Sequence, residues 1–314
     1  MDRELILFSI ADCIRSIPSA IDGLKPGQRK VMFGCFKRKL SSEIKVAQLA
    51  GYVSEHSAYH HGEQSLTQTI VGLAQDYVGS NNVNLLAPIG QFGTRMQGGK
   101  DAASPRYIYT NLTACTRLVF DSRDDASVEY LSSDGDSVEP KWYIPIVPIV
   151  LINGADGIGT GWSSSVPNYR PRDVVQNIIR LINDEPLCEL VPWYKGFTGR
   201  IWSDSPGETT NFNVEGVIKQ TGANTVEITE LPIRKWTQTY KEFLDSCIES
   251  TENFTKKSDS LRIKSYMDHS TDTSVHFTVT LSQEQMTKAI HVGLAKHFKL
   301  TGSLSVSNLV LSTR

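Results

Sequence analysis

The sequence predicts an α+β fold with two domains. The 314-residue chain is long enough for two ordinary domains that each bury a core. Its first half carries mainly helix patterns, whereas its second half alternates short strand patterns with helices. Two prolines interrupt the pattern within residues 166–172, which indicates a boundary. We therefore expect domains at residues 1–162 and 163–314.

Composition and charge exclude several classes of protein. Hydrophobic residues make up 39% and charged residues 21%, which is typical of a globular protein. No tract approaches the length of a membrane span or has the pattern of a signal peptide, so we expect no membrane partner. Five scattered cysteines without a CxxC pair indicate neither a disulfide framework nor a zinc site.

The net charge of −2 is unevenly distributed along the chain. Residues 1–120 carry 13 basic and 9 acidic groups, a balance of +4. Residues 121–141 carry 2 basic and 7 acidic groups, a balance of −5. A polyanion would therefore favour the N-terminal third of the chain.

The first elements are a short apolar run and a basic helix. Residues 3–24 contain the apolar run and then a loop that Pro18 interrupts. Pro26 opens a helix, because proline fits the first helical position. Apolar residues recur in this helix at helical spacing, at Val31, Met32, Cys35 and Phe36. Lys25 and Arg29 stand at its start, where backbone N–H groups also point outward, so they are the better candidates for phosphate contact.

Two further helices are predicted at residues 43–50 and 64–78. Three histidines lie between them, at His56, His60 and His61. A metal site is one interpretation, but no cysteine or carboxylate cluster accompanies the histidines, so we favour a hydrogen-bonding role. Adjacent helices followed by a glycine-bearing hairpin are typical of a helix-turn-helix or winged-helix unit.

The middle of the chain is predicted as an acidic loop, a strand and a turn. Residues 121–140 are polar and acidic, which favours an exposed loop. Residues 142–162 indicate a buried strand followed by a glycine-rich turn. The glycines Gly154, Gly157 and Gly159 have the wrong spacing for a dinucleotide-binding fingerprint.

The second half is predicted to alternate strands and helices. Pro171 starts a helix with an apolar stripe, and four strand patterns follow, in FTGRIW, GVIKQ, TVEITELP and SVHFTVTL. Helices are predicted at residues 236–248 and 283–299, the latter opened by a capping box at Ser282. No cluster of ionisable residues nominates an active site, so we expect a structural role. The final apolar segment has the pattern of a strand that stops abruptly, so we expect the chain to be part of a longer protein.

The stretch from Gln91 to Thr110 carries the strongest functional signal. It combines a glycine-rich turn, spaced basic residues and two tyrosines. Backbone groups and cations can hold a phosphate while a hydroxyl attacks it, so this composition favours phosphoryl chemistry. We predict that Tyr107 is a nucleophile towards a nucleic-acid phosphodiester.

Four long motifs in this order resemble the DNA breakage and rejoining region of a eukaryotic-type type IIA DNA topoisomerase (DNA topoisomerase II). They are RSIPSAIDGLKPGQRKV, KVAQLAGYVSEHSAYHHGEQSL, QFGTRMQGGKDAASPRYIYT and EPKWYIPIVPIVLINGADGIGTGW. Later segments, VPWYKGFTGRI, VEITELPIRKWT and FKLTGSLS, resemble the tower domain of that family. The resemblance covers nearly the whole chain. It implies a winged-helix domain followed by a mixed α/β tower domain that ends before the family's coiled coil.

The resemblance implies a role for each site residue. Tyr107 matches the tyrosine that becomes joined to the 5′ phosphate of DNA and releases a 3′ hydroxyl, and Arg106 and His61 match its catalytic helpers. Ile158 matches an isoleucine that wedges between bases and bends the duplex, although core packing would be the preferred interpretation without the resemblance. Phosphate-binding cations are implied at Arg15, Lys25, Arg29 and Lys100.

The resemblance also implies partners and cofactors. The longer protein would use Mg²⁺ and ATP, act as a homodimer on double-stranded DNA in the nucleus, and carry its metal ligands in a separate TOPRIM domain. Asp134 and Asp136 match the Asp-x-Asp pattern of the metal ligands but lie in the acidic loop. We therefore expect no metal ligands in this chain and no DNA cleavage by this chain alone. The alternative is a winged-helix DNA-binding or architectural protein without chemistry, which leaves Tyr107 without a purpose.

Overall fold

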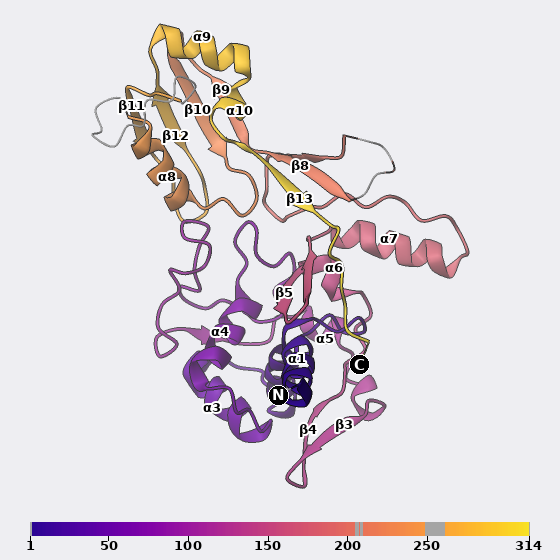
Figure 1. Cartoon of the computed structure of the whole chain (residues 1–314). Coiled ribbons are helices and arrows are strands. Elements are labelled where there is room, and N and C mark those ends of the chain that lie inside the picture. The colour runs from indigo at the N-terminus through magenta and orange to yellow at the C-terminus, as the bar shows by residue number, and fades with distance from the viewer. Residues whose placement is uncertain (1, 205–206, 208–209, 249–260, 314) are drawn as a thin grey trace.

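The chain has a lower lobe, built mostly of helices, and an upper lobe, built of antiparallel sheets and helices (Figure 1). A computed structural model describes residues 2–204, 207, 210–248 and 261–313. Both ends of the chain lie at the lower lobe, because the last segment returns from the upper lobe (Figure 1). The predicted α+β class is confirmed.

Four helices make up most of the lower lobe: α1 (Asp2–Ser16), α2 (Pro26–Lys37), α3 (Val46–His56) and α4 (Glu63–Ala74). The helix predicted to open at Pro26 is confirmed, and the apolar run before it forms α1. The next predicted helix begins at Val46, because the residues before it form strand β1 (Ile44–Lys45). That strand pairs with β2 (Tyr109–Thr110), which brings the end of the glycine-rich stretch against the start of α3.

One apolar core joins α2, α3 and α4. Side chains of α2, α3 and α4 with no exposed surface meet in it: Val31, Met32, Leu49, Val53, Leu66 and Ile70. Each large aliphatic side chain buried in this way contributes roughly 1.5–3 kcal/mol. A Cβ on Gly34 of α2 would lie 2.6 Å from Cγ2 of Val53, so the helices leave no room there for a larger residue. This close packing produces the predicted helix-turn-helix-like unit.

The acidic segment after β2 folds differently from its prediction. Helix α5 (Thr116–Val119) and the 3-10 turn η1 (Asp124–Ala126) lead into a hairpin of β3 (Tyr130–Ser133) and β4 (Asp136–Pro140). Asp134 and Gly135 make the turn with φ angles of 52° and 90°, a geometry that these residue types tolerate. Glu139 is buried and pairs with Lys30 of α2 at 2.8 Å. The loop prediction is wrong because the segment forms a hairpin whose second strand is partly buried, at Val138 as well as Glu139.

The prediction of a buried strand at the start of residues 142–162 is also wrong. Residues 141–148 contain no strand, and the apolar run ends in the short helix α6 (Ile149–Asn153). Pro145 and Pro148 explain the difference, because proline cannot donate a hydrogen bond to a sheet. The glycine-rich turn is part of a hairpin in which β5 (Ala155–Gly159) pairs with β6 (Trp162–Val166). The proposed domain boundary between residues 162 and 163 falls inside β6 and stays a prediction.

Helix α7 (Pro171–Ile182) begins at its proline as predicted. It projects from the side of the molecule (Figure 1). Val174 is 2% exposed, whereas Ile179 and Ile182 of the apolar stripe are 46% and 75% exposed. The described residues therefore leave most of this stripe uncovered.

The strands of the upper lobe are β7 (Arg200–Trp202), β8 (Asn211–Glu215), β9 (Val217–Gln220), β10 (Thr225–Glu230), β11 (Ser265–Asp268), β12 (Phe277–Thr280) and β13 (Thr301–Ser305). Its helices are α8 (Thr237–Ser246), α9 (Gln283–Val292) and α10 (Leu294–His297). One sheet has the order β11-β12-β10-β9 and the other β13-β8-β7. Tyr240 and Leu244 of α8 have no exposed surface and pack in the core of the larger sheet.

The ends of the upper-lobe helices follow local chemistry. The predicted cap is confirmed, because Ser282 Oγ accepts a hydrogen bond from the N–H of Gln285 at 3.2 Å. The predicted helix over residues 283–299 is divided into α9 and α10 at Gly293, whose φ is 96°. In the described part of the chain, no helix combines the length and apolar character needed to cross a bilayer.

Candidate functional site

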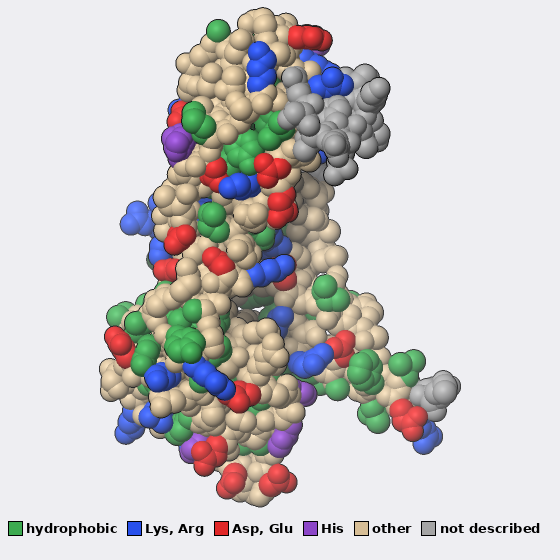
Figure 2. Space-filling view, turned by 90° about the vertical axis from the view of Figure 1, so that its left-hand side faces the viewer, with side chains coloured by type: hydrophobic (Ala, Val, Ile, Leu, Met, Phe, Trp, Pro, Cys, Tyr) green, Lys and Arg blue, Asp and Glu red, His purple; other side chains and the backbone are tan. Residues whose placement is uncertain are grey.

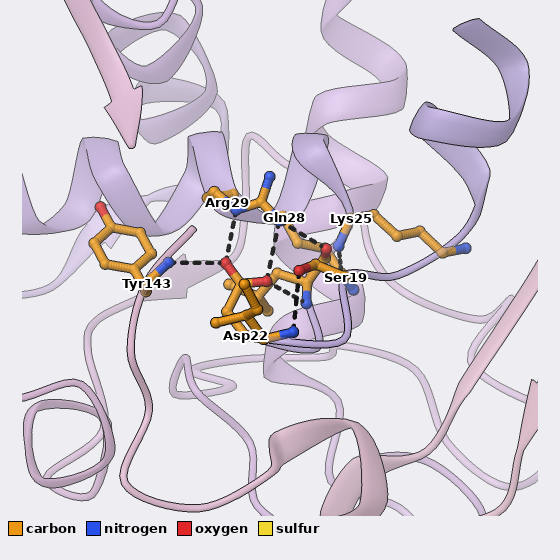
Figure 3. Close-up of polar contacts among 8 residues, drawn as sticks. Ser19, Asp22, Lys25, Gln28, Arg29 and Tyr143 are labelled. Carbon is orange, nitrogen blue, oxygen red and sulfur yellow. Dashed lines mark hydrogen bonds and ion pairs between the residues drawn. The ribbon is translucent and has the colours of Figure 1, made fainter. Parts of the chain in front are cut away.

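A buried carboxylate, Asp22, organises the loop between α1 and α2 (Figure 3). Its oxygens accept hydrogen bonds from Arg29 Nε at 2.7 Å and Nη2 at 3.0 Å. They also accept the backbone N–H groups of Leu24 and Tyr143, each at 3.0 Å. Four donors around one fully buried carboxylate satisfy its charge and tie together the loop, α2 and the segment before α6.

This network gives Arg29 a different role from the predicted phosphate contact. Arg29 is 7% exposed, and its Nη2 also donates to the carbonyl oxygen of Leu24 at 3.1 Å. The guanidinium is thus held inside the fold as the counter-charge of Asp22, because a buried charge needs a partner. Arg29 is therefore not available for phosphate contact. Asp22 lies in the loop that Pro18 interrupts, and nothing in the local sequence indicates its burial.

Lys25 joins the start of α2 to the β5–β6 hairpin. Its Nζ donates to the carbonyl oxygen of Asp156 at 2.6 Å. Partial burial lowers the pKa of Lys25, and the nearby carboxylate of Asp156 opposes that shift. The ammonium group is consequently fixed in place while still facing a cavity.

That cavity, of about 720 Å³, collects three of the predicted basic residues. Arg15, Lys25 and His61 line it, together with polar groups of α4 such as Gln68 and Thr69. The Arg15 guanidinium lies 3.2 Å from Asp12, but its side chain is 61% exposed, so this pair leaves it accessible. The His61 ring contacts Tyr59 edge to face, with a centroid distance of 5.6 Å. A phosphate would meet basic side chains from three separate segments here.

A second cavity, of about 530 Å³, holds Lys100. Gln68 and Gly72 of α4 line both cavities, so the two are neighbours. Ser104 and Pro105 line the second one, and Lys100 itself is exposed.

Tyr107 lies two residues after Pro105, in a turn. Its side chain projects into solvent, and the residue is 77% exposed. Hydrogen bonds fix the turn from both sides, because the N–H groups of Ala47 and Val46 at the start of α3 donate to the carbonyl oxygens of Pro105 and Ile108, each at 3.1 Å. Helix starts have unused N–H groups, and here they hold the backbone around the tyrosine.

Arg106 and Tyr109, on either side of Tyr107, are both exposed. Arg106 is exposed in the same turn. Tyr109 lies in β2, is 36% exposed, and has its ring 5.9 Å from the Nζ of Lys45. The structure brings Arg15, Lys25 and His61 together at the first cavity. Neither Tyr107 nor Arg106 lines either cavity, and the residues that precede them line the second one.

Ile158 is at the surface of the β5–β6 hairpin. It is 85% exposed, which argues against the core-packing interpretation. An aliphatic side chain with so little cover suits insertion into an apolar stack. Trp162, near the tip of the same hairpin, is 62% exposed.

The glycines beside Ile158 serve the hairpin's contact with α1. A Cβ on Gly157 would lie 2.2 Å from the carbonyl oxygen of Ser16, and one on Gly159 would lie 3.1 Å from Sγ of Cys13. Thr160 also donates to Asp12 of α1 at 2.9 Å. The packing of the hairpin against α1 therefore requires residues without a side chain at these two positions.

The glycine-rich turn after Gln91 is likewise occupied within the fold. The N–H of Gly93 donates to the side chain of Gln91 at 3.0 Å, and that of Gly99 donates to the carbonyl oxygen of Thr94 at 2.9 Å. Gly98 packs against the indole of Trp236, where a Cβ would lie 2.2 Å from Cε2. This turn therefore joins the lobes, whereas the sequence indicated a backbone grip on phosphate.

The described residues do not fit a divalent-metal site. Among residues 2–204, 207, 210–248 and 261–313, no three His, Cys, Asp or Glu side chains gather as metal ligands. His56 instead stacks on Tyr52 with a centroid distance of 4.0 Å, and its Nδ1 lies 2.9 Å from the carbonyl oxygen of Tyr52. Basic and acidic side chains are interspersed over the face seen in Figure 2, so no broad field of one sign marks that face.

Comparisons with known proteins agree in sequence and in structure. A family model for the A-subunit of DNA gyrase/topoisomerase IV matches residues 15–314. The chain is 53% identical to DNA topoisomerase 2 of Candida albicans over 310 residues, 99% of this chain and 20% of that protein. It is also 53% identical to DNA topoisomerase 2-alpha of Homo sapiens over 311 residues, again 99% of this chain and 20% of that protein.

The structural comparison extends over the same range. A crystal structure of the Plasmodium falciparum topoisomerase II DNA-binding, cleavage and re-ligation domain matches with a TM-score of 0.92 and 50% identity. The match covers 99% of this chain and 41% of that chain. This chain spans about a fifth of the length of the curated relatives it matches.

Proposed function

The chain belongs to the family of DNA gyrase/topoisomerase IV A-subunits, and we propose that it is the DNA-cleaving part of a type II DNA topoisomerase in which Tyr107 attacks the DNA backbone. The observation that carries the proposal is the exposed tyrosine in a turn fixed by the start of α3, next to cavities lined by Arg15, Lys25, His61 and Lys100. The likeness to a cleavage and re-ligation domain favours this function over a DNA-binding protein without chemistry.

The proposed reaction uses the tyrosine hydroxyl as nucleophile. The Tyr107 oxygen loses its proton and bonds to phosphorus, the bond to the 3′ oxygen breaks, and a 3′ hydroxyl leaves. A phenol is a weak nucleophile near neutral pH, so it needs positive charge or a base close by. Arg106, adjacent in the turn, and His61 in the neighbouring cavity are the proposed helpers. The reverse attack by the 3′ hydroxyl reseals the strand, because the phosphotyrosyl bond retains the energy of the phosphodiester.

The basic residues hold the negative charge that spreads over the phosphate in this reaction. Arginine can bind two phosphate oxygens at once, whereas lysine acts as a compact point charge. Arg15, Lys25 and Lys100 are proposed for this role, because Lys100 lines the cavity next to the tyrosine turn and Arg15 and Lys25 line the cavity that adjoins it.

The remaining parts of the reaction are proposed to lie elsewhere in a longer protein. Mg²⁺ would stabilise charge on the DNA phosphates and would be held by a TOPRIM domain, since the described residues offer no ligand set for it. ATP would bind to separate domains and drive strand passage. We further propose that two copies act together on duplex DNA in the nucleus, each supplying one tyrosine.

The 314-residue chain is expected to bind duplex DNA without cleaving it, with strong dependence on salt. Each lost phosphate contact should reduce the slope of log K against log salt by about 1. Binding of a labelled duplex at several salt concentrations, for the wild type and for Arg15→Ala and Lys100→Ala, measures this. Arg123→Ala, which removes an exposed cation of the acidic segment, is the matched control and should leave the slope unchanged. Binding that does not respond to salt would contradict the proposed interface.

Replacing Ile158 with alanine is expected to reduce the bend of the bound DNA. Wedges of this kind kink duplexes by about 20–90°, and alanine is too short to enter a base step. Energy transfer between dyes at the two ends of a bound duplex reports the bend. Ile182→Ala in α7 removes another isoleucine, 75% exposed, and should leave the bend unaltered. An unchanged end-to-end distance in the Ile158 variant would refute the wedge.

A further inference from the structure

A buried ion pair joins the glycine-rich segment at residues 91–101, here called the docking loop, to the upper lobe. Arg95 of the docking loop is 6% exposed and Glu230 of β10 is 2% exposed. The Nη2 of Arg95 contacts Oε1 of Glu230, and Nη1 lies 3.5 Å from Oε2. These residues are far apart in sequence and lie in different lobes, so the pair is a cross-link between the lobes.

The carboxylate of Glu230 is oriented by three additional donors. The N–H and the hydroxyl of Thr198 donate to Oε2, each at 3.2 Å. The N–H of Leu231 donates to Oε1 at 2.9 Å. A carboxylate held at this many points fixes the guanidinium that it binds, so the position of Arg95 is set by the upper lobe.

The start of α8 binds the docking loop beside the ion pair. The N–H groups of Thr237 and Gln238 donate to the carbonyl oxygens of Arg95 and Met96, at 3.3 and 3.0 Å. The indole of Trp236 lies over Gly98, with no room for a side chain there. The first N–H groups of a helix have no partner within it, and here the docking loop satisfies two of them.

Hydrogen bonds connect the docking loop to the segment that precedes the tyrosine turn. Asp101 closes the loop by accepting the N–H of Thr94 at 2.9 Å and its hydroxyl at 2.5 Å. Gln91 at the base of the loop accepts the N–H of Ala103 at 2.9 Å, and Ser104 and Pro105 follow directly before the turn. A displacement of Arg95 would therefore be transmitted to Lys100 and to the backbone that carries Tyr107.

We propose that Arg95 and Glu230 are positioning residues for the cleavage reaction: their ion pair couples the orientation of the upper lobe to the placement of Lys100 and Tyr107. This inference rests on the proposed function. It assigns the upper lobe a part in the chemistry, where the sequence indicated a structural role alone. Because neither side chain is exposed, the pair acts through the docking loop and touches no DNA itself.

The test is a set of variants in the longer protein of which this chain is proposed to form part. Glu230→Gln keeps the volume and can still accept hydrogen bonds from Thr198 or Leu231, but it leaves the Arg95 charge buried without a partner, so its Tm should fall. The rates are therefore compared at a temperature well below the Tm of every variant. Arg95→Met removes the cation, and Arg95→Lys restores it without the planar fork. For each, the rate of covalent joining to DNA is measured at saturating DNA, together with the Kd for DNA and the Tm.

We expect Glu230→Gln and Arg95→Met to lower the rate at saturating DNA by about tenfold or more while the Kd changes less than about twofold, because misplacement of a reacting group affects the chemical step. Arg95→Lys should recover part of the rate. Asp125→Asn, which breaks the Arg117–Asp125 pair within the lower lobe, is the matched control and should leave the rate unchanged.

Two results would overturn the coupling. One is a wild-type rate in Glu230→Gln. The other is a parallel loss of DNA binding, rate and Tm with no recovery in Arg95→Lys, which would reduce the pair to a stabilising contact. Failure of the proposed function is separate, because it would appear as absence of covalent joining in the wild type itself.

Discussion

Replacement of Tyr107 by phenylalanine in the longer protein is expected to abolish the covalent protein–DNA adduct. The substitution removes only the hydroxyl, and the ring is already 77% exposed, so neither the core nor the turn loses a contact. The hydrogen bonds that fix the turn come from the backbone and remain. Without the attacking oxygen no phosphotyrosyl bond can form, and adduct yield should fall to below about one thousandth of the wild type.

The adduct is trapped with denaturant on a labelled duplex in the presence of Mg²⁺ and is quantified after electrophoresis. Tyr109→Phe is the matched control, because it removes the same hydroxyl two residues away, in β2. The control should keep most of its adduct yield, and both variants should bind DNA like the wild type. If adducts persisted in Tyr107→Phe, or were lost in Tyr109→Phe instead, the assignment of the nucleophile would be wrong.

The second large effect is expected for Asp22, and it concerns stability. Asp22→Ala leaves the Arg29 guanidinium buried without its counter-charge and deprives the N–H groups of Leu24 and Tyr143 of their acceptor. Removing one partner of a buried ion pair costs about 3–5 kcal/mol of unfolding free energy. That is a large share of the roughly 5–15 kcal/mol that stabilises a typical domain.

Urea unfolding of the 314-residue chain measures this effect. The double variant Asp22→Asn with Arg29→Met removes both charges together, and it should recover part of the loss because no charge then stays buried alone. Asp125→Asn disrupts an ion pair of the same lobe whose side chains are 32% and 31% exposed, and it should change the free energy of unfolding by about 0–1 kcal/mol. Equal effects of Asp22→Ala and Asp125→Asn would show that the buried network contributes little.

The features that the sequence predicts correctly depend on local chemistry. Helix α2 begins at Pro26 and buries Val31, Met32 and Cys35 because proline position and helical spacing act within a few residues. The cap of α9 at Ser282 follows from the same local rule. The strand predicted before α6 is wrong because Pro145 and Pro148 outweigh the apolar content of that segment, and both prolines are visible in the sequence.

The candidate site could be predicted from the sequence only in part. The sequence nominates Arg15, Lys25 and His61 from three separate segments, and the fold brings them to one cavity. The same reasoning nominates Arg29, yet it lies inside the protein against Asp22. The same carboxylate accepts the N–H of Tyr143, more than a hundred residues away, and no local pattern indicates that contact.

By itself, the sequence determined the helices with strong caps and spacing, the identity of Tyr107 as the proposed nucleophile, and the membership of a family whose motifs run through the whole chain. Only the tertiary structure decided what the glycines do. Gly98 lies under Trp236, and Gly157 lies against Ser16 of α1, so both pack against other elements of the fold. The physical reason is that the sequence shows where the backbone is free to adopt unusual conformations, because glycine has no side chain. It does not show which atoms pack against that glycine, because they belong to distant parts of the chain.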